Sequence, residues 1–276
     1  MLNINMLKIN SVMNLLKEKY ELNYGIMEPQ FGNILAWSGS LALENISNCD
    51  ALYHNVDHTI MVTMVGQEII KGKHLKEGGV TPNDWLHYSL ALLFHDIGYV
   101  KGICSNDTLD EVDSGIDGNM IKIDKDGTSA SLAPYHVDRG KLFVKERFQS
   151  QPLINADIIC EYIEMTRFPC PEGDFYKDTK SLAGLTRAAD FIGQLGDPSH
   201  FTKIPALYYE FVETGGDKKF NYKNPGDVRR RFAKFFWESV SPFIGDALDY
   251  LEVTQEGKEW ISNLHSHVFE IEHYRK

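Results

Sequence analysis

Residues 85–98 (WLHYSLALLFHDIG) decide the fold class, because almost all of the first ten positions are apolar. A helix that is apolar on all sides is usually buried inside a larger helical protein. The four residues before it, TPND, begin with Thr81 as a possible N-cap and place Pro82 at the first helical position. We therefore predict a buried helix that starts at Pro82 and ends at Gly98.

Helical periodicity extends over most of the remaining chain. Apolar residues recur at helical spacing in nine further segments. These segments are 8–20, 34–46, 50–72, 136–149, 154–167, 181–195, 203–214, 226–240 and 243–272. Residues 101–134 break the pattern, and MIKIDKDG within them is typical of a short hairpin. The sequence predicts an all-α fold with one irregular, partly hairpin-like insertion and C-terminal helices, forming a single domain over residues 1–276.

Composition excludes some classes of partner. The chain has 276 residues and a net charge of −11. Proteins that coat nucleic acid or an anionic membrane need a basic face, so we expect neither role. No window has the roughly 18 apolar residues of a membrane span, and the N-terminus lacks the pattern of a signal peptide. The four cysteines form no CxxC pair and indicate free thiols in a cytoplasmic protein. The sequence does not indicate an oligomeric state.

Three separate segments carry residues that could converge on a metal. YHNVDH places His54 and His58 four residues apart, which on one helix is one turn and one face. His95 and Asp96 close the apolar helix, and Asp190 lies inside a second strongly apolar helix. A buried carboxylate is costly unless it is paired or binds a metal. Imidazole with carboxylate is a ligand set for Zn²⁺, Mn²⁺, Fe²⁺ or Mg²⁺-assisted sites.

The order His, His-Asp, Asp on successive helices resembles the HD superfamily of metal-dependent phosphohydrolases. YHNVDH also resembles the YHNxxH motif of cyclic-nucleotide phosphodiesterases. The resemblance covers about residues 50–195, which would form the HD core, with the insertion at about 101–134 and a helical extension at about 200–276. It implies a helical bundle, a divalent metal ion and hydrolysis of phosphate esters.

The resemblance also implies roles for individual residues. The positions that match metal ligands are His58, His95, Asp96 and Asp190. His54 matches the general acid, and Asp96 would also orient the attacking water. His136 falls where a further ligand of binuclear members would lie, whereas residues 164–166 (EMT) have no histidine at the next such position. We expect one firm metal site and a weaker second site that uses Asp96 and His136.

Three residues are candidates for substrate binding. Asn55 matches a residue that supports the metal ligands in the phosphodiesterases. Arg139 and Lys141 follow His136 at a predicted helix start, where they would contact phosphate or remain solvated charges. Arg187, one turn before Asp190, would contact phosphate or form a structural ion pair.

The predicted function is hydrolysis of a small phosphate ester, by preference a nucleotide, with the reaction split between mono- and diesterase. Two alternatives are a metal-binding sensor without turnover and a di-iron oxygenase, which needs the extra histidines. Charge is unevenly distributed: residues 106–126 carry seven acidic groups and two lysines, and residues 217–234 carry seven basic groups and two aspartates. We expect the acidic insertion to rim the pocket and disfavour long polyanions.

Overall fold

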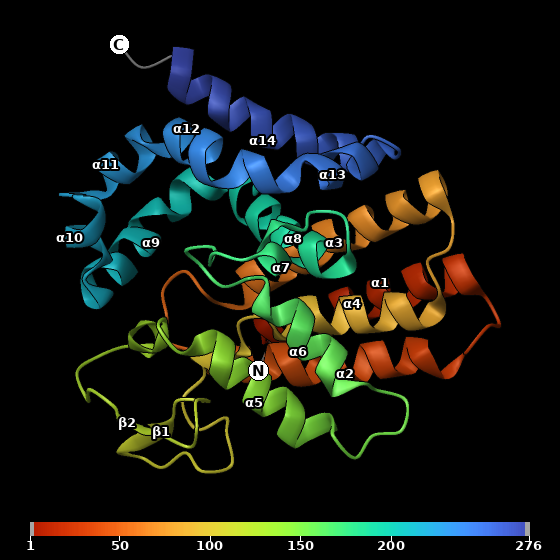
Figure 1. The fold of residues 1–276 in the computed structure, drawn as a ribbon, viewed down its shortest axis with the longest axis horizontal. Coiled ribbons are helices and arrows are strands. Elements are labelled where there is room, and N and C mark those ends of the chain that lie inside the picture. Colours follow the sequence, from red (N-terminus) through yellow and green to blue (C-terminus); the bar gives the residue numbers. More distant parts are fainter. Residues whose placement is uncertain (1–2, 274–276) are drawn as a thin grey trace.

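The structure is a computed structural model that describes residues 3–273, and helices dominate it (Figure 1), so the predicted all-α fold is confirmed. The chain up to residue 164 contains α1 (Ile4–Tyr24), α2 (Gln30–Ile46), α3 (Val56–Glu77), α4 (Pro82–Phe94), α5 (His136–Phe148) and α6 (Ala156–Glu164). The rest of the chain contains α7 (Asp174–Lys177), α8 (Leu182–Leu195), α9 (His200–Thr214), α10 (Gly216–Phe220), α11 (Pro225–Arg230), α12 (Phe232–Phe235), α13 (Ser241–Leu251) and α14 (Gln255–His273). Short elements join them: the 3-10 helices η1 (Ile97–Tyr99) and η2 (Ser129–Leu132), and a π-helical turn, η3 (Phe236–Val240).

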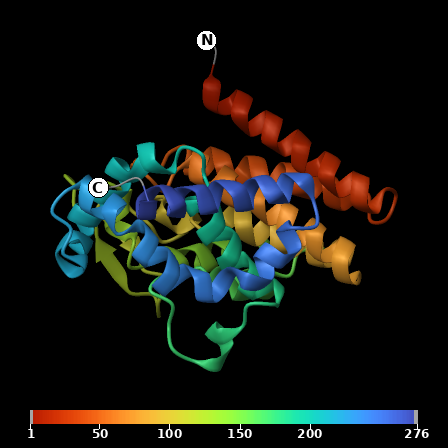
Figure 2. The same cartoon turned by 90° about the horizontal axis from the view of Figure 1, so that it is seen from above.

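Helices α3, α4 and α8 form the centre, and α1 and α2 pack beside them as a helical hairpin. Helices α13 and α14 cover the side that is uppermost in Figure 1, and the N-terminal end of α1 projects from the body in Figure 2. One cluster of buried apolar side chains extends from Ile9 in α1 to Ile271 in α14. No helix within residues 3–273 has the length and apolarity required to cross a membrane.

The central helix α4 has the predicted start. Thr81 and Asp84 form a reciprocal capping box, and Pro82 is the first helical residue. Every side chain from Trp85 to Phe94 is buried. The helix ends at Phe94 rather than Gly98, so His95 and Asp96 lie in the turn that leads into η1.

Two glycines allow the close approaches that bring the central helices together. A Cβ on Gly193 in α8 would lie 2.7 Å from the Cα of Val62 in α3. A Cβ on Gly98 would lie 1.9 Å from the carbonyl oxygen of His136, at the start of α5. Any larger residue at Gly98 would therefore push α5, and His136 with it, away from the turn that carries Asp96.

The insertion contains a hairpin, with β1 (Glu111–Asp113) antiparallel to β2 (Met120–Lys122) and Val112 opposite Ile121. The predicted segment MIKIDKDG supplies only the second strand, so the hairpin lies earlier in the chain than expected. The insertion lies at one edge of the molecule, beside the end of α5 that carries His136 (Figure 1). Its return segment is tied to the body, because Thr128 N–H donates to Glu213 of α9 at 2.6 Å and Ser129 N–H donates to Asp50 at 2.6 Å.

Two predicted C-terminal helices are interrupted. The segment 226–240 is divided into α11, α12 and η3, and the segment 243–272 is divided into α13 and α14. The second break occurs after Leu251, where Thr254 Oγ1 accepts a hydrogen bond from Gly257 N–H and starts the next helix. All four cysteines are free thiols, as predicted.

Candidate metal centre

Three helices, α3, α4 and α8, bring the predicted ligand residues to one place. His58 lies in the first turn of α3, His95 and Asp96 follow α4, and Asp190 lies within α8. His58, His95 and Asp96 are almost fully buried, and the Asp190 side chain is 21% exposed. The site is therefore set in the helical core with one carboxylate reaching its open side.

The ligand-type atoms of these residues converge. His58 Nε2 lies 3.3 Å from both Asp96 Oδ2 and Asp190 Oδ1. His95 Nε2 lies 3.1 Å from Asp96 Oδ2, 3.7 Å from Asp190 Oδ1 and 3.4 Å from His58 Nε2. Nitrogen and oxygen ligands lie about 2.0–2.2 Å from a tetrahedral Zn²⁺, which places them roughly 3.4 Å from one another. His58, His95 and Asp190 thus form a group that could hold a metal ion.

The environment of the Asp96 carboxylate favours a bound cation. Its Oδ2 atom is buried and, within the described part of the chain, has no hydrogen-bond partner, although two ring nitrogens lie within 3.3 Å. Buried carboxylate oxygens are rarely left without a partner. A cation between the rings and the carboxylate would provide one.

Backbone contacts fix two of the nearby rings in the tautomer that a ligand needs. His95 Nδ1–H donates to Leu92 O at 2.8 Å, which leaves the lone pair of Nε2 facing the carboxylates. His136 Nδ1–H likewise donates to Ala133 O at 2.7 Å, and its Nε2 lies 3.8 Å from Asp96 Oδ1. Burial lowers the pKa of His136, which keeps its ring neutral. Asp96 therefore lies between two groups of imidazole nitrogens.

The centre attracts positive charge. Burial, the largest influence on His58, lowers its pKa, but the Asp190 and Asp96 carboxylates outweigh burial and raise the pKa to about 10. Burial raises the pKa of Asp96, but His95 and His58 hold it well below its usual range. A divalent cation would experience the same attraction from the two carboxylates.

A family model described as Npun_R2479-like matches residues 2–274 of the chain. The chain belongs to the Npun_R2479-like family. No curated protein matches it.

In this family member, His54 forms a second group beside the centre. The prediction that it shares a helix with His58 is wrong, because α3 starts at Val56 and His54 lies in the preceding loop. The two rings are still close, with centroids 5.5 Å apart. Proximity therefore comes from the loop before the helix and not from helical spacing.

Two residues that sequence reasoning missed hold His54. Glu210 of α9 accepts a hydrogen bond from His54 Nδ1 at 2.6 Å and from the backbone N–H groups of Tyr53 and His54. Burial lowers the pKa of His54, but the Glu210 carboxylate outweighs it and raises the pKa above the usual value. Tyr99 is stacked between His54 and His136, with centroids 4.5 Å from each ring. Tyr99 follows the His-Asp pair closely in sequence, whereas nothing in the sequence marks Glu210.

Asn55 acts on the helix rather than on the pocket. Its Oδ1 accepts from the N–H groups of Asp57 and His58, and its Nδ2 donates to Leu52 O. Both ends of its amide are engaged in capping α3. The predicted substrate-binding role is corrected to one of support, since the cap sets the position of His58.

The side chains of Arg139 and Lys141 are both engaged by other protein groups and are not available to bind phosphate. Arg139 is 0% exposed and donates to both carboxylate oxygens of Asp107 and to the carbonyls of Gly98, Val100 and Asp113. It ties the insertion to α5, so its prediction as a phosphate contact is wrong.

Lys141 is engaged in a separate ionic cluster. It contacts the carboxylates of Asp138 and Glu164, and Arg167 contacts the same two carboxylates. The cluster joins α5 to the end of α6. Lys141 is therefore not free to bind phosphate in this conformation.

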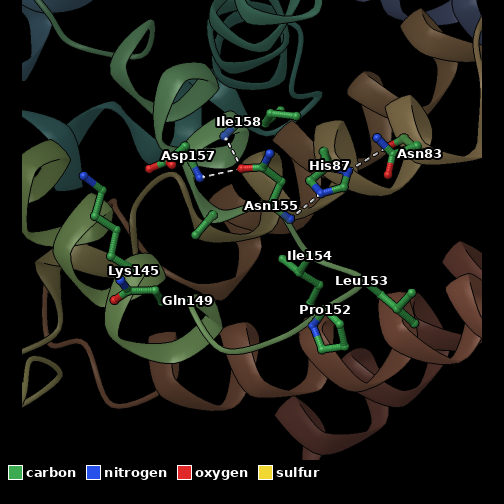
Figure 3. A pocket seen from close by; sticks show the side chains of 11 residues that line it. Asn83, His87, Lys145, Gln149, Pro152, Leu153, Ile154, Asn155, Asp157 and Ile158 are labelled. Atoms are coloured by element: carbon green, nitrogen blue, oxygen red, sulfur yellow. Dashed lines mark hydrogen bonds between the residues drawn. The ribbon is translucent and has the colours of Figure 1, made fainter.

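Two further polar residues, His87 and Thr166, have structural roles. The hollow of about 560 Å³ shown in Figure 3 is lined by residues of α4, α5, α6 and the loop between α5 and α6, and none of the candidate metal ligands lines it. Its buried His87 donates from Nδ1 to Asn83 O at 2.8 Å and accepts from Asn155 N–H at 2.7 Å. Thr166, near the position of the absent histidine, donates to Ile163 O at 2.8 Å.

Proposed function

We propose that this protein is a metal-dependent phosphohydrolase of the HD superfamily, acting on a small phosphate ester and by preference on a nucleotide. The observation that carries the proposal is the convergence of two imidazole nitrogens on Asp96 and Asp190, with Asp96 Oδ2 buried and without a hydrogen-bond partner in the described residues. This donor set suits Zn²⁺, Mn²⁺ or Fe²⁺.

The four residues His58, His95, Asp96 and Asp190 would hold the ion. When bound, such an ion lowers the pKa of its water from about 15.7 towards 7 and polarises a phosphoryl oxygen. Asp96 has a second oxygen, Oδ1, on the side of His136. This oxygen can accept a hydrogen bond from the attacking water and orient it. A second, weaker ion would use Asp96 Oδ1 and His136 Nε2.

His54 is the proposed general acid. Glu210 favours its protonated form and fixes its Nδ1, so the Nε2–H on the other side of the ring can donate to the departing oxygen. Proton transfer of this kind typically contributes about 10²–10⁴ in rate. Tyr99 stacks on one face of the His54 ring and limits its rotation. Glu210 and Tyr99 are positioning residues, because each acts through His54.

The test is turnover by purified protein of measured metal content. Bis-p-nitrophenyl phosphate, p-nitrophenyl phosphate and a nucleotide panel would be offered with Mn²⁺, Mg²⁺ or Zn²⁺. We expect metal-dependent hydrolysis that falls by about 10³ or more in Asp96→Ala, because a ligand and a water-orienting group are lost together. Asp174→Ala is the matched control, since that carboxylate is 97% exposed.

Other outcomes would overturn the proposal. Metal binding without hydrolysis of any substrate would instead indicate a sensor. Oxygen consumption with a mixed-valence iron signal would indicate an oxygenase. Equal turnover by wild type and Asp96→Ala would remove the metal centre from the reaction.

A further inference from the structure

Helix α1 carries apolar residues on two opposite faces. One row is buried against the rest of the molecule and consists of Ile9, Met13, Leu16, Tyr20 and Tyr24. A second row, which we call the outer strip, consists of Ile4, Leu7, Ser11, Leu15, Glu18 and Leu22. With 3.6 residues per turn, the two rows lie on opposite sides of the helix. The outer side of a surface helix is normally polar, so four large apolar residues there are unusual.

The outer strip is open to solvent along its whole length. Each of its residues is exposed, and Leu22 is 85% exposed. Seven of the 21 large apolar residues that are exposed within residues 3–273 lie in residues 4–27, including Ile26 in the turn after α1. Helix α1 lies along one edge of the molecule in Figure 2, where its N-terminal end projects from the body. Single exposed apolar residues are ordinary, but a contiguous row marks a site of interaction.

The order of residues in the outer strip is symmetric about Leu15. On either side of this leucine come first a polar residue, Ser11 or Glu18, and then a leucine, Leu7 or Leu22. In an antiparallel pair of α1 helices with a two-fold axis near Leu15, Leu7 of each copy packs against Leu22 of the other. The Ser11 hydroxyl then faces the Glu18 carboxylate and can donate a hydrogen bond to it. A two-fold interface requires such a self-complementary order.

The flanks of the outer strip do not oppose this pairing. Lys8 and Lys19, on the flank towards the body, are already paired with carboxylates of α3. The other flank carries two asparagines and an ion pair within the helix, Lys17 with Glu21. A lipid surface fits less well, because the Glu18 carboxylate would lose its water there and the net charge of −11 opposes anionic lipids. The charges therefore favour a second copy over a membrane.

We propose that the outer strip of α1 binds the same strip of a second copy of this chain, antiparallel and with the two-fold axis near Leu15. Residues 4–22 span roughly 27 Å at 1.5 Å per residue, which gives an interface smaller than that of most stable complexes. The dimer is therefore reversible, with a dissociation constant in the micromolar range. None of the six residues is a candidate metal ligand, so this inference does not rest on the proposed function.

The first measurement is the mass of the full chain in solution, by sedimentation velocity at about 1–100 µM protein. We expect wild type to shift from monomer to dimer over this range. Leu22→Asp should weaken the dimer at least about 100-fold, because it places an unpaired carboxylate against Leu7 at two symmetric positions. Leu109→Asp is the matched control, since that leucine lies in the insertion and is 95% exposed. The control should dimerise as wild type does.

Three results would overturn the proposal. One is wild type that stays monomeric at about 100 µM. Another is a Leu22→Asp variant that dimerises as tightly as Leu109→Asp. The third is a wild-type monomer that floats with neutral phosphatidylcholine vesicles while Leu22→Asp does not, because lipid would then be the occupant of the strip.

The second measurement tests the antiparallel orientation. Leu15→Cys should form a disulfide between copies under mild oxidation, because the two positions lie at the axis within reach of an S–S bond. Leu7→Cys should form none, since its two positions lie roughly 22 Å apart along the paired helices at 1.5 Å per residue. Oxidised wild type measures the background from the four native thiols. Cross-linking of Leu7→Cys in place of Leu15→Cys would indicate another orientation and contradict the assignment.

Discussion

Two pairs of buried histidines, His58 with His95 and His200 with His267, each contain a ring held by a backbone carbonyl but differ in their surroundings. His95 donates from Nδ1 to a backbone carbonyl, and so do His200 and His267, which donate to Gln194 O and Leu195 O at the end of α8. Around His58 and His95, two carboxylates lie within 3.7 Å.

Around His200 and His267 the neighbours include the rings of Phe201 and Phe232. The one carboxylate that acts on His200, that of Asp197, is paired with Lys203 at 2.6 Å. The effect on protonation is opposite. Burial, together with His267, lowers the pKa of His200 to about 4, whereas the carboxylates raise the pKa of His58 to about 10 against burial. A ring fixed by its Nδ1 occurs in both pairs, so the acidic partners are what distinguish the group that could hold a metal ion.

Removing one carboxylate should make His58 and His95 poor metal ligands, as we expect His200 and His267 to be. Asp190→Asn is expected to weaken Zn²⁺ or Mn²⁺ binding by more than about 100-fold, because loss of a mere supporting residue already costs 10–100-fold. Isothermal titration calorimetry on metal-stripped protein would measure it. His200→Gln is the control and should bind metal as wild type does. Equal affinity in wild type and Asp190→Asn would show that the acidic partners do not make the site.

The buried ion pair of Arg139 and Asp107 is a further contrast, because its nitrogen and carboxylate oxygen atoms all have hydrogen-bond partners. Asp107→Asn should lower the free energy of unfolding by about 3–5 kcal/mol, because it leaves a buried arginine without its anion. Metal affinity should be unchanged. Urea denaturation would measure the loss. Asp110→Asn, whose partner Lys125 is 80% exposed, is the control and should change stability by less than about 1 kcal/mol. Equal stability of the two variants would contradict the structural role of Arg139.

The lowered pKa of His200 should make the free energy of unfolding depend on pH. In the unfolded chain His200 takes up a proton near its usual pKa of about 6.5, whereas in the folded protein it does so only near 4. Between these values the unfolded state binds more protons, so stability falls as the pH falls from about 6.5 to about 4, by roughly 2–3 kcal/mol. Urea titrations at several pH values would show a shallower fall in His200→Gln. Parallel curves for the two proteins would refute it.

The smallest effect concerns the cap that positions His58. Asn55→Ala should lower the free energy of unfolding by about 1 kcal/mol. Asn155→Ala offers a matched control, because Asn155 caps α6 with the same pair of backbone contacts away from the metal centre. Thermal denaturation should show similar losses for both variants, and only Asn55→Ala should also weaken metal binding. Equal metal affinity in both would separate the cap from the site.

The sequence by itself determined the features that depend on neighbouring residues. The buried helix α4, its cap and its Pro82 start follow from local composition and were predicted, as were the free thiols and one strand of the hairpin. The convergence of His58, His95 and Asp190 was also predicted, because an aspartate in a strongly apolar helix has few alternatives to a partner or a metal.

Only the tertiary structure decided the partners. Glu210 lies 156 residues from His54 and still fixes its ring, which no local pattern could indicate. The sequence predicts Arg139 as a phosphate contact, but its partner is Asp107. It predicts Asn55 as a substrate-binding residue, but Asn55 caps α3, which starts directly after it. Charges and polar groups take their roles from what they contact, and in a folded chain those contacts are mostly distant in sequence.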